Sequence, residues 1–369
     1  MEEKIDILLT TYNTKIEYLK IQLDSILNQT YKNFNLIISD DCSTDENVRA
    51  VLEEYANKDN RITLYFQEKN LGYTKNFEFV LEKSNAEYIA FSDHDDIWYS
   101  EKIEKSLKTL KEMDVDLVYS DAKQIDENGN TLHNSYLRYK NMPIINEKYF
   151  PEIFKTENNK ITYNRENCFI LPFSRHIAIG CSQLFTKNVR DKMLPFTENT
   201  VAHDWHSVYI ASNLKGIYCI DEPLFGYRLH ENNAFGGRSF TQNIKIWKKE
   251  NGNSYNSFLK YRNKVITKTY LAGVLMCKDY TSKIFENDEV EDNLSKIENK
   301  NIDNQENFKI KKENEVIKYF EEAQKSKVFY WKIHKYFEYL SFKGIGKRAF
   351  KEIAILHFPI LSFVIFKLK

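Results

Sequence analysis

Short apolar runs alternate with amphipathic stretches through the first 120 residues of the chain. Four runs have the length and composition of buried strands, and they occupy residues 5–10, 34–39, 62–66 and 88–92. The first stretch between them carries apolar side chains at helical spacing, namely Leu19, Leu23, Ile26 and Leu27. Repeated strand and helix units of this length predict an α/β fold with a mainly parallel sheet and helices on both faces.

Two further helices are predicted between the later strands. Ser43 and Glu46 form a capping-box pattern that opens a helix running to about residue 57. Another helix is predicted at residues 74–84. In sheets of this kind ligands bind beyond the carboxyl ends of the strands, so the chemistry is expected in the loops that follow them.

Regular patterning fades after this first part of the chain. Residues 129–167 are polar and aromatic without a clear period, which indicates a loop or an insertion, and order returns near residue 177. We therefore expect a catalytic domain over residues 1–240 and a helical C-terminal region over 241–369. Within that region, residues 286–315 are rich in Asn, Glu, Asp and Lys and are predicted to form a charged linker or an exposed hairpin.

The tail at residues 327–369 combines basic and aromatic side chains. Nine Lys and Arg residues face only Glu338 and Glu352, and the apolar run 353–366 is shorter than the roughly 20 residues that span a bilayer. The tail is predicted to lie on the membrane surface. The alternative is that its aromatic face packs on the core or on a second subunit, as in a homodimer.

Composition excludes several classes of protein. The 53 basic residues balance the 53 acidic ones, so no overall charge favours nucleic acid as a partner. The five cysteines are odd in number and contain no CxxC, which fits neither a disulfide framework nor a thiolate zinc site and favours a reducing compartment. The first residues include no basic segment before an apolar run, and a cytoplasmic location is expected.

The densest acidic segment, Asp93, His94, Asp95 and Asp96, follows the apolar run 88–92 directly. Three carboxylates at the end of a strand repel one another unless a cation lies among them. Mg²⁺ and Mn²⁺ take such oxygen ligands and also bind diphosphate oxygens. The segment predicts a metal–diphosphate site, and the alternative is a solvated acidic turn that caps the next helix.

Two more polar segments follow the first and second apolar runs. Thr10, Thr11, Tyr12 and Asn13 end the first, and Ser39, Asp40 and Asp41 end the second. Hydroxyls and carboxylates at adjacent strand ends can accept from a pyrimidine N–H and from ribose hydroxyls, so a nucleotide crevice is predicted. Taken singly, Asp40 and Asp41 are more often turn or helix-capping residues than nucleotide ligands.

Five motifs in this order and spacing resemble the family 2 glycosyltransferases with the GT-A fold, and the variant looks like the bacterial rhamnosyltransferase-type branch. The motifs are TTYN, SILNQTY, SDDCSTDE, NLGYTKNF and FSDHDDIW, and the resemblance covers about residues 4–235. It implies a mixed, mainly parallel sheet flanked by helices, with a nucleotide-sugar half at about 1–125 and an acceptor half at about 126–240.

The resemblance also implies a function. An inverting, metal-dependent enzyme of the hexosyltransferase class would move rhamnose or a hexose from a dTDP- or UDP-sugar to a glycan or lipid-linked saccharide. The enzyme would act in bacterial surface polysaccharide biosynthesis. It would be a peripheral protein on the inner face of the plasma membrane. The cofactor would be Mn²⁺ or Mg²⁺, and no nucleic acid would take part.

Roles for individual residues on the donor side follow from the same resemblance. Thr10, Tyr12 and Asp41 would bind the nucleotide, supported by Asp40. Asp93 would contact the ribose or the metal, Asp95 would be the principal metal ligand, and Asp96 would support the site. The residues bordering the nucleotide would be Asn70, Gly72, Lys75 and Asn76, with Lys75 offering a cation to phosphate.

On the acceptor side, residues 179–185 resemble the family's acceptor strand. Residues 202–205 resemble the segment that supplies the catalytic base, which would be Asp204, with His203 as a structural partner or an acceptor contact. The alternative for Asp204 is the N-cap of a helix. Farther on, His230 would complete metal coordination and Arg228 would pair with phosphate.

One departure from the family pattern concerns the segment after the acidic motif. The family often has a proline there, where this chain has Ile97, Trp98, Tyr99 and Ser100. Ser100 is expected to cap the following helix instead.

Competing functions are disfavoured by the loop after the first strand. A nucleotidyltransferase would need a glycine-rich basic loop there, and a Rossmann dehydrogenase would need GxGxxG; TTYN is neither. A catalytically inactive GT-A-like scaffold or membrane-bound subunit is the remaining alternative. The presence of Asp41, Asp93, Asp95 and Asp204 argues against it.

Overall fold

A computed structural model describes residues 3–140, 142, 144–148, 154–157, 160–163, 178–197, 200, 202–230 and 249–250 of the chain. Residues up to Arg228 belong to one compact unit, and a second unit begins at Leu229. The predicted C-terminal helical region, its charged linker and its basic tail lie outside the described residues, apart from residues 249–250. No helix in the described ranges is long and apolar enough to cross a membrane.

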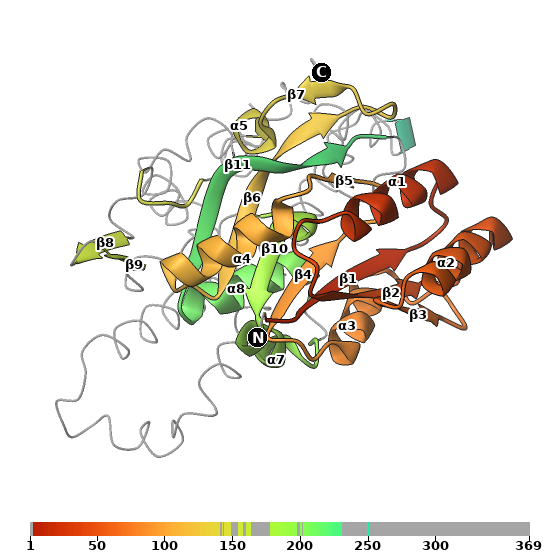
Figure 1. The fold of residues 1–369 in the computed structure, drawn as a ribbon, viewed down its shortest axis with the longest axis horizontal. Helices are drawn as coiled ribbons and strands as arrows, with labels where there is room; N and C mark the ends of the chain where they lie inside the picture. Colours follow the sequence, from red (N-terminus) through yellow and green to blue (C-terminus); the bar gives the residue numbers. More distant parts are fainter. Residues whose placement is uncertain are drawn as a thin grey trace. The chain divides into compact units, whose positions relative to one another are not determined.

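Nine strands of the described residues form one sheet (Figure 1). Their order is β3 (Ile62–Phe66), β2 (Phe34–Asp40), β1 (Ile5–Thr11), β4 (Tyr88–Ser92), β10 (Gln183–Thr186), β6 (Leu117–Ile125), β11 (Ile217–Arg228) and β5 (Ile97–Trp98), with β7 (Thr131–His133) paired to β6. A separate hairpin consists of β8 (Phe154–Glu157) and β9 (Lys160–Tyr163).

The sheet is mixed and mainly parallel. The first four strands in the chain, β1 to β4, run parallel to one another, and β6 and β11 form a second parallel pair. The strand β10 lies antiparallel between β4 and β6, and β5 and β7 are antiparallel edges. The predicted class of sheet is therefore confirmed. Because two antiparallel steps separate β4 from β6, these two strands point the same way and end at the same edge of the sheet.

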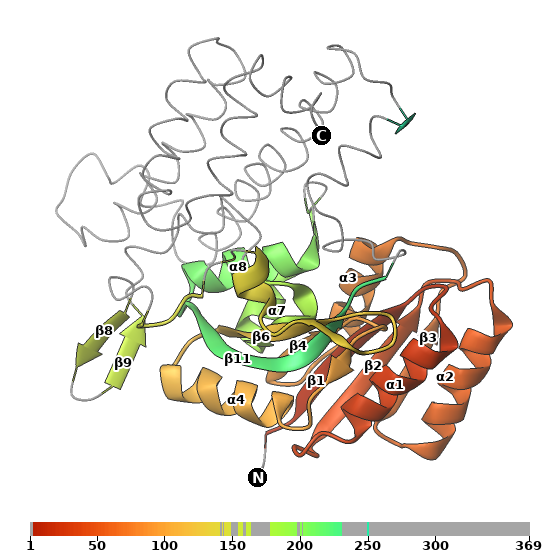
Figure 2. The same ribbon diagram turned by 90° about the horizontal axis from the view of Figure 1, so that it is seen from above.

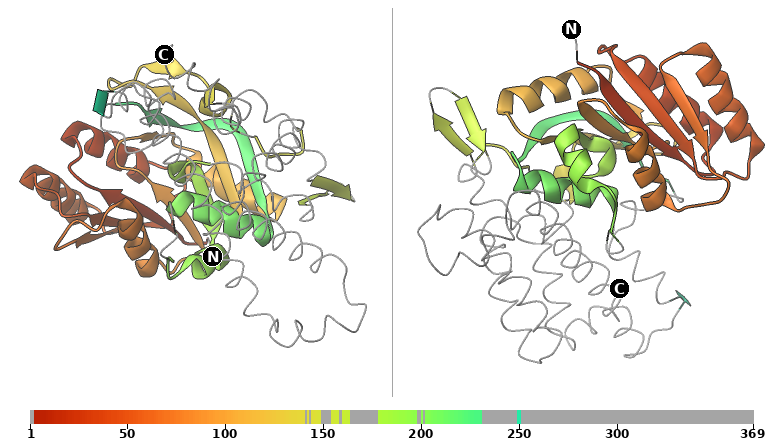
Figure 3. Two further views of the ribbon diagram at one scale, coloured as in Figure 1. Left: turned by 180° about the vertical axis from the view of Figure 1, so that it is seen from behind. Right: turned by 90° about the horizontal axis from the view of Figure 1, so that it is seen from below.

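Helices cover both faces of the sheet (Figures 2 and 3). One face carries α1 (Ile16–Leu27), α2 (Glu46–Lys58) and α4 (Lys102–Met113). The other carries α3 (Tyr73–Lys83), α7 (Lys187–Met193) and α8 (His203–Asn213). Strands covered on both sides read as continuous apolar runs, and every residue of β1 is indeed buried.

Two predicted helix caps are wrong. The helix α2 begins at Glu46 with Asp45 as its N-cap, whose carboxylate accepts the Asn47 N–H, while the Ser43 hydroxyl bonds to Asp40 instead. The helix α4 has Glu101 at its N-cap position, and Ser100 offers its carbonyl to the Thr30 amide. The Ser43 hydroxyl also accepts the Asn13 N–H, so in both cases a contact with a distant part of the chain uses the residue that local pattern assigned to capping.

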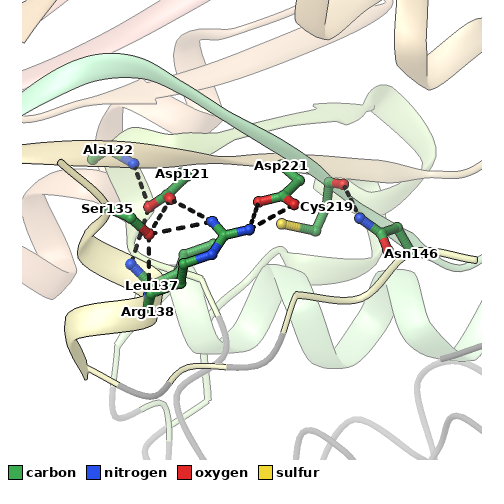
Figure 4. Close-up of polar contacts among 8 residues, drawn as sticks. All are labelled: Asp121, Ala122, Ser135, Leu137, Arg138, Asn146, Cys219 and Asp221. Atoms are coloured by element: carbon green, nitrogen blue, oxygen red, sulfur yellow. Dashed lines mark hydrogen bonds and ion pairs between the residues drawn. The ribbon is translucent and has the colours of Figure 1, made fainter. Parts of the chain in front are cut away.

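A short helix, α5 (Tyr136–Lys140), is pinned across β6 and β11 by a polar cluster (Figure 4). The buried carboxylate of Asp121 on β6 accepts from the Ser135 hydroxyl and, at 3.0 Å, from the Leu137 amide. The Arg138 guanidinium reaches Asp221 on β11 at 2.7 Å. This cluster fixes the start of the predicted acceptor half against the sheet.

The first strand contains a buried charge, Asp6, that holds the opposite end of the sheet together. Its Oδ2 accepts the N–H groups of Asn85 and Ala86 at 2.7 and 2.9 Å, and its Oδ1 accepts from the Asn35 amide at 2.7 Å. The turn before β4 is thereby tied to β1 and β2. A buried carboxylate with three donors is stable in place, but its removal leaves those donors without a partner.

We expect Asp6→Ala to lower the free energy of unfolding by about 2–4 kcal/mol, because two backbone amides lose a charged acceptor. Urea unfolding of the full chain measures the change. Asn35→Ala removes only one side-chain donor and is expected to cost about 1 kcal/mol. Equal effects of the two substitutions would contradict the role given to the Asn85 and Ala86 amides.

Candidate active site

The polar segments after β1, β2 and β4 meet at one edge of the sheet. Thr10 lies beside Ser39 in the β1–β2 register, and Leu9 lies beside Ser92 in the β1–β4 register. The His94 ring nitrogen Nδ1 lies 3.1 Å from the Thr10 carbonyl oxygen, which joins the end of β1 to the acidic segment. The structure thus brings together the three segments that the sequence predicts to form a crevice.

The loops after β1 and β2 are bonded to each other. The Asn13 amide donates to the Ser43 hydroxyl at 2.8 Å, and Asn13 Oδ1 accepts the Thr44 N–H at 2.8 Å. The buried Asp40 carboxylate accepts both the N–H and the hydroxyl of Ser43. Asp40 therefore serves as a turn residue, while Tyr12 beside this clamp is 44% exposed.

Asp41 organises the loop that leads into α3. Its two oxygens accept the N–H groups of Leu71 and Gly72 at 2.6 and 2.9 Å, and its carbonyl accepts from Asn70 at 3.3 Å. Gly72 precedes α3 with φ of 81°, a conformation that favours glycine. The predicted nucleotide residues Asp41, Asn70 and Gly72 are thus in contact, and their contact with a base stays a prediction.

Lys75 and Asn76 occupy different environments on α3. The Lys75 ammonium pairs with Glu78 at 2.5 Å on the surface, beside a hollow of about 470 Å³ that Asn70 also lines. Asn76 is buried and exchanges hydrogen bonds with the hydroxyl and carbonyl of Ser39. Asn76 therefore positions α3 on β2, and Lys75 keeps its predicted phosphate role only by leaving Glu78.

The acidic segment after β4 is largely buried. Burial, and then the charge of Asp95, raises the pKa of Asp93 to about 6. Burial, with the charges of Asp95 and Asp93, also holds the pKa of Asp96 well above its ordinary value. Asp96 Oδ1 accepts the Arg228 N–H at 3.0 Å. The carboxylates of this segment repel one another, as predicted for a site that takes a cation.

A cysteine joins this cluster, which the sequence pattern did not indicate. Within the described residues, one ligand atom each from Asp93, Asp96 and Cys181 lie within 4.8 Å of one another. Cys181 belongs to a 3₁₀ turn, Gly180–Ser182, that precedes β10, where the sequence predicts a continuous strand. Only the contact across the sheet reveals its place beside the carboxylates.

Lys102 is a second residue that the sequence analysis missed. It is fully buried in the first turn of α4, with its ammonium 4.5 Å from the Trp98 ring centroid and 5.5 Å from that of Phe225. Burial lowers its pKa to about 8, against the charges of Cys181 and Asp96. The sequence did contain a sign of this burial, because Lys102 lies on the same helix face as Ser106 and Leu110.

Asp204, the predicted base, lies in the first turn of α8. Its Oδ2 accepts the Gly180 N–H at 3.0 Å, and its charge contributes to the raised pKa of Asp93. The N-cap of α8 is Ala202, so the alternative of Asp204 as a helix cap is wrong. The candidate base is therefore held within electrostatic reach of the acidic segment.

His203 is a structural partner of this helix. Its ring stacks on Phe77 with 3.6 Å between centroids and meets Phe91 edge-on at 4.6 Å. A Cβ at position 180 would lie 2.7 Å from His203 Nε2, so only glycine fits there. The packing of His203 and the Gly180 hydrogen bond together orient Asp204.

Arg228 is buried at the end of β11, with 1% of its surface exposed. Its Nε donates to the Asp95 carbonyl at 2.8 Å, its Nη1 donates to the carbonyls of Asp126 and Glu127, and its guanidinium covers the Tyr18 ring at 4.4 Å. These contacts give Arg228 a role in holding the acidic segment, and pairing with phosphate stays a prediction. His230, in the second unit, stays a predicted ligand.

The sequence model of the family described as "Glycosyl transferase family 2" matches residues 6–187, which include the acidic segment and Cys181. This stretch, just under half of the chain, is similar to that family. The predicted enzyme class, a glycosyltransferase, and the GT-A fold class are confirmed, whereas the rhamnosyltransferase-like branch stays a prediction.

Proteins with similar sequences or structures match different lengths of this chain. An uncharacterized glycosyltransferase of Methanocaldococcus jannaschii is 26% identical over 76% of this chain and 95% of its own length. TuaG of Bacillus subtilis, named for teichuronic acid biosynthesis, is 30% identical over 35% of this chain and 50% of its own length. The structure of S. aureus TarS residues 1–349 with UDP-GlcNAc has a TM-score of 0.45 at 17% identity, covering 77% of this chain and 73% of that one.

The raised pKa of Asp93 means that the ionised carboxylate lowers the free energy of unfolding in the absence of metal. Because the folded-state pKa of about 6 exceeds the ordinary value of 3.8, the folded state binds more protons between these values. Stability contributed by this group therefore falls as the pH rises through that window.

We expect Asp93→Asn, studied with a chelator, to raise the free energy of unfolding by about 1–3 kcal/mol at about pH 8 and to change it little at about pH 4. Urea unfolding at the two pH values measures this difference. Asp114→Asn is the control, because Asp114 is exposed and its φ of 49° also suits asparagine. A loss of stability in Asp93→Asn at the higher pH would contradict the repulsion.

Proposed function

We propose that this domain transfers a sugar from a nucleoside diphosphate to an acceptor hydroxyl, with inversion at the anomeric carbon and with a divalent metal. The observation that carries the proposal is the placement of Asp204. Its carboxylate is oriented by the Gly180 N–H and lies within electrostatic reach of Asp93. One carboxylate is thus available to the acceptor, and a separate acidic set is available to the donor.

The donor occupies the edge formed by β1, β2 and β4 in this proposal. Thr10 and Asp41 face the base, and Asp93 faces the ribose or the metal. Asp41 already orders the loop at Leu71 and Gly72, so the crevice wall is preformed before the nucleotide arrives. A pyrimidine nucleotide, as dTDP or UDP carrying rhamnose or a hexose, fits the donors and acceptors at this edge.

The acidic segment fits Mn²⁺ or Mg²⁺. Asp96 Oδ2 is buried and accepts no hydrogen bond from a nitrogen or oxygen donor of the described residues, which is the state expected of a group shaped for a cation. Asp93 and Asp95 are the ligands assigned by the family resemblance. The metal would neutralise charge on the departing diphosphate.

Asp204 acts as the general base. It takes the proton of the acceptor hydroxyl as that oxygen bonds to the anomeric carbon, while the bond from this carbon to the diphosphate oxygen breaks on the opposite side. The nucleoside diphosphate leaves with the electron pair of that bond. Inversion follows from a single displacement, and no covalent intermediate on the protein is required.

The acceptor is proposed to be a glycan or a lipid-linked saccharide of a bacterial surface polysaccharide. Similarity to TuaG, which is named for teichuronic acid biosynthesis, supports this class. A place on the inner face of the plasma membrane is proposed on the basis of the basic, aromatic residues 327–369. The same residues could instead join two subunits of a homodimer.

Thermal unfolding of the full chain with UDP, dTDP, GDP or CMP, each with and without Mn²⁺, tests the donor site. One pyrimidine diphosphate is expected to raise Tm by roughly 4–8 °C at about a hundredfold excess over its Kd, and only with the metal. Asp95→Ala should remove this shift, whereas Asp24→Ala on the exposed side of α1 should keep it. The absence of any nucleotide response would favour the scaffold alternative.

We expect Asp204→Asn to keep the donor affinity and to lose about 10²–10⁴-fold in turnover, because only proton removal is lost. Asparagine can still accept the Gly180 N–H, so the fold of the turn is preserved. Release of nucleoside diphosphate, with water or lipid-linked saccharides as acceptor, measures turnover, and calorimetry measures donor affinity. Asp191→Asn on the surface of α7 is the control. A weaker donor affinity with unchanged turnover would exclude the role of base.

A further inference from the structure

The sulfur of Cys181 lies among groups that bind metals. Cys181 is buried in the turn before β10, and one oxygen each of Asp93 and Asp96 and the sulfur lie within 4.8 Å of one another. Oxygen ligands at about 2.1 Å and a thiolate at about 2.3 Å from one ion are separated from each other by distances of this order. The three atoms are thus already gathered closely enough to share one cation.

The cluster has more acceptors than its surroundings satisfy. Asp96 is fully buried, its Oδ1 accepts the Arg228 N–H, and its Oδ2 accepts from no nitrogen or oxygen donor of the described residues. The Cys181 thiol is hydrogen-bonded to this carboxyl. Burial and the carboxylates also raise the pKa of the Cys181 thiol well above its ordinary value. A thiol proton can bridge to only one carboxylate, whereas a divalent cation would serve all three groups at once.

Lys102 favours the ionised form of this cluster from the buried side. Its ammonium lies against Trp98 and Phe225, makes no hydrogen bond to a described residue, and opposes the rise in the pKa of Cys181. A thiolate bound to a divalent ion is stable because the ion's charge replaces the proton. Binding of the ion releases the Cys181 proton, together with any proton held by the Asp93 and Asp96 carboxyls, to solvent.

We propose that Cys181 is a thiolate ligand of the divalent metal, together with Asp93 and Asp96. The proposal takes this metal to be the one that the proposed function uses. Oxygen-only sites suit Mg²⁺, whereas a sulfur ligand shifts preference away from Mg²⁺ and most strongly towards Co²⁺, Zn²⁺ and Cd²⁺. The site in this chain therefore selects softer ions than the set of Asp93, Asp95 and His230 expected from the sequence.

Titration of the chelator-treated full chain with Co²⁺ tests this ligand set without reference to activity. A thiolate bound to Co²⁺ gives a near-ultraviolet charge-transfer band, which oxygen and nitrogen ligands do not give. We expect this band in a variant that keeps Cys181 and carries serine at Cys42, Cys168, Cys219 and Cys277. The band should be absent from Cys181→Ser and from Asp96→Asn, and present in Cys219→Ser, whose replaced thiol is also buried.

Calorimetry with Cd²⁺ and Mg²⁺ gives the second reading. Cys181→Ser should lose about tenfold or more in Cd²⁺ affinity and change its Mg²⁺ affinity by less than about twofold. Near-ultraviolet circular dichroism checks the fold of each variant. If Cys181→Ser does not fold, the protein with Cys181 as its single cysteine decides the question alone.

Two results would overturn the proposal. One is Co²⁺ binding to the single-cysteine protein without the band, and the other is a band that survives in Cys181→Ser. Either result removes the sulfur ligand and leaves the glycosyl transfer intact, because transfer fails only if the Mn²⁺-dependent nucleotide response and turnover are both missing.

Discussion

The structure depends on the burial of negative charge at the carboxyl end of β4. Asp93 and Asp96 stay at this edge although burial and mutual repulsion raise the pKa of both carboxyls. The groups that stabilise Asp96 and the Asp95 backbone come from later in the chain: the Arg228 backbone and guanidinium at the end of β11, and the Lys102 ammonium in α4. A buried acidic group without such partners would cost several kcal/mol. The acidic segment of the nucleotide half is therefore completed by Arg228 from the acceptor half.

A second regularity is the use of carboxylates to hold backbone amides. Asp41 accepts from Leu71 and Gly72, Asp204 accepts from Gly180, and Asp6 accepts from Asn85 and Ala86. Each bond fixes a loop by its main chain, so the loop's side chains stay available for other contacts. The carboxylates that look like catalytic candidates in the sequence thus also define the shape of the crevice.

The first four strands and the polar segments that follow them could be predicted because they depend on local sequence pattern. Apolar runs covered by helices on both faces give unbroken hydrophobic segments, and polar residues directly after them mark one edge of the sheet. The antiparallel strand β10 could not be predicted in the same way, since its place between β4 and β6 depends on pairing across more than 60 residues. The turn that precedes β10 could not be predicted either, and this turn places Gly180 beside Asp204 and Cys181 beside Asp96.

The wrong helix-cap predictions also result from tertiary contacts that local pattern does not reveal. Ser43 and Ser100 fit local capping patterns, but Ser43 bonds to Asp40 and Asn13, and the Ser100 carbonyl serves Thr30. For Arg228, pairing with phosphate stays a prediction, and three backbone carbonyls already accept from its Nε and Nη1. Residue type and spacing identify what a side chain is able to bind, whereas the tertiary contacts decide which partner it meets.

The cationic side chains inside the protein cannot take the place that the proposed function gives to a metal, because they lie on the buried side of the acidic segment. Lys102 is fully buried and Arg228 nearly so, and both approach the segment from within the protein. Their charges partly offset the negative charge of the segment from inside the protein and cannot contact a diphosphate without unpacking Trp98 or Tyr18. Charge that develops on a leaving group is stabilised only by a cation that reaches it. In the proposed function such a cation has access at the more exposed Asp93, while Arg228 and Lys102 act on the neighbouring Asp95 carbonyl and Asp96.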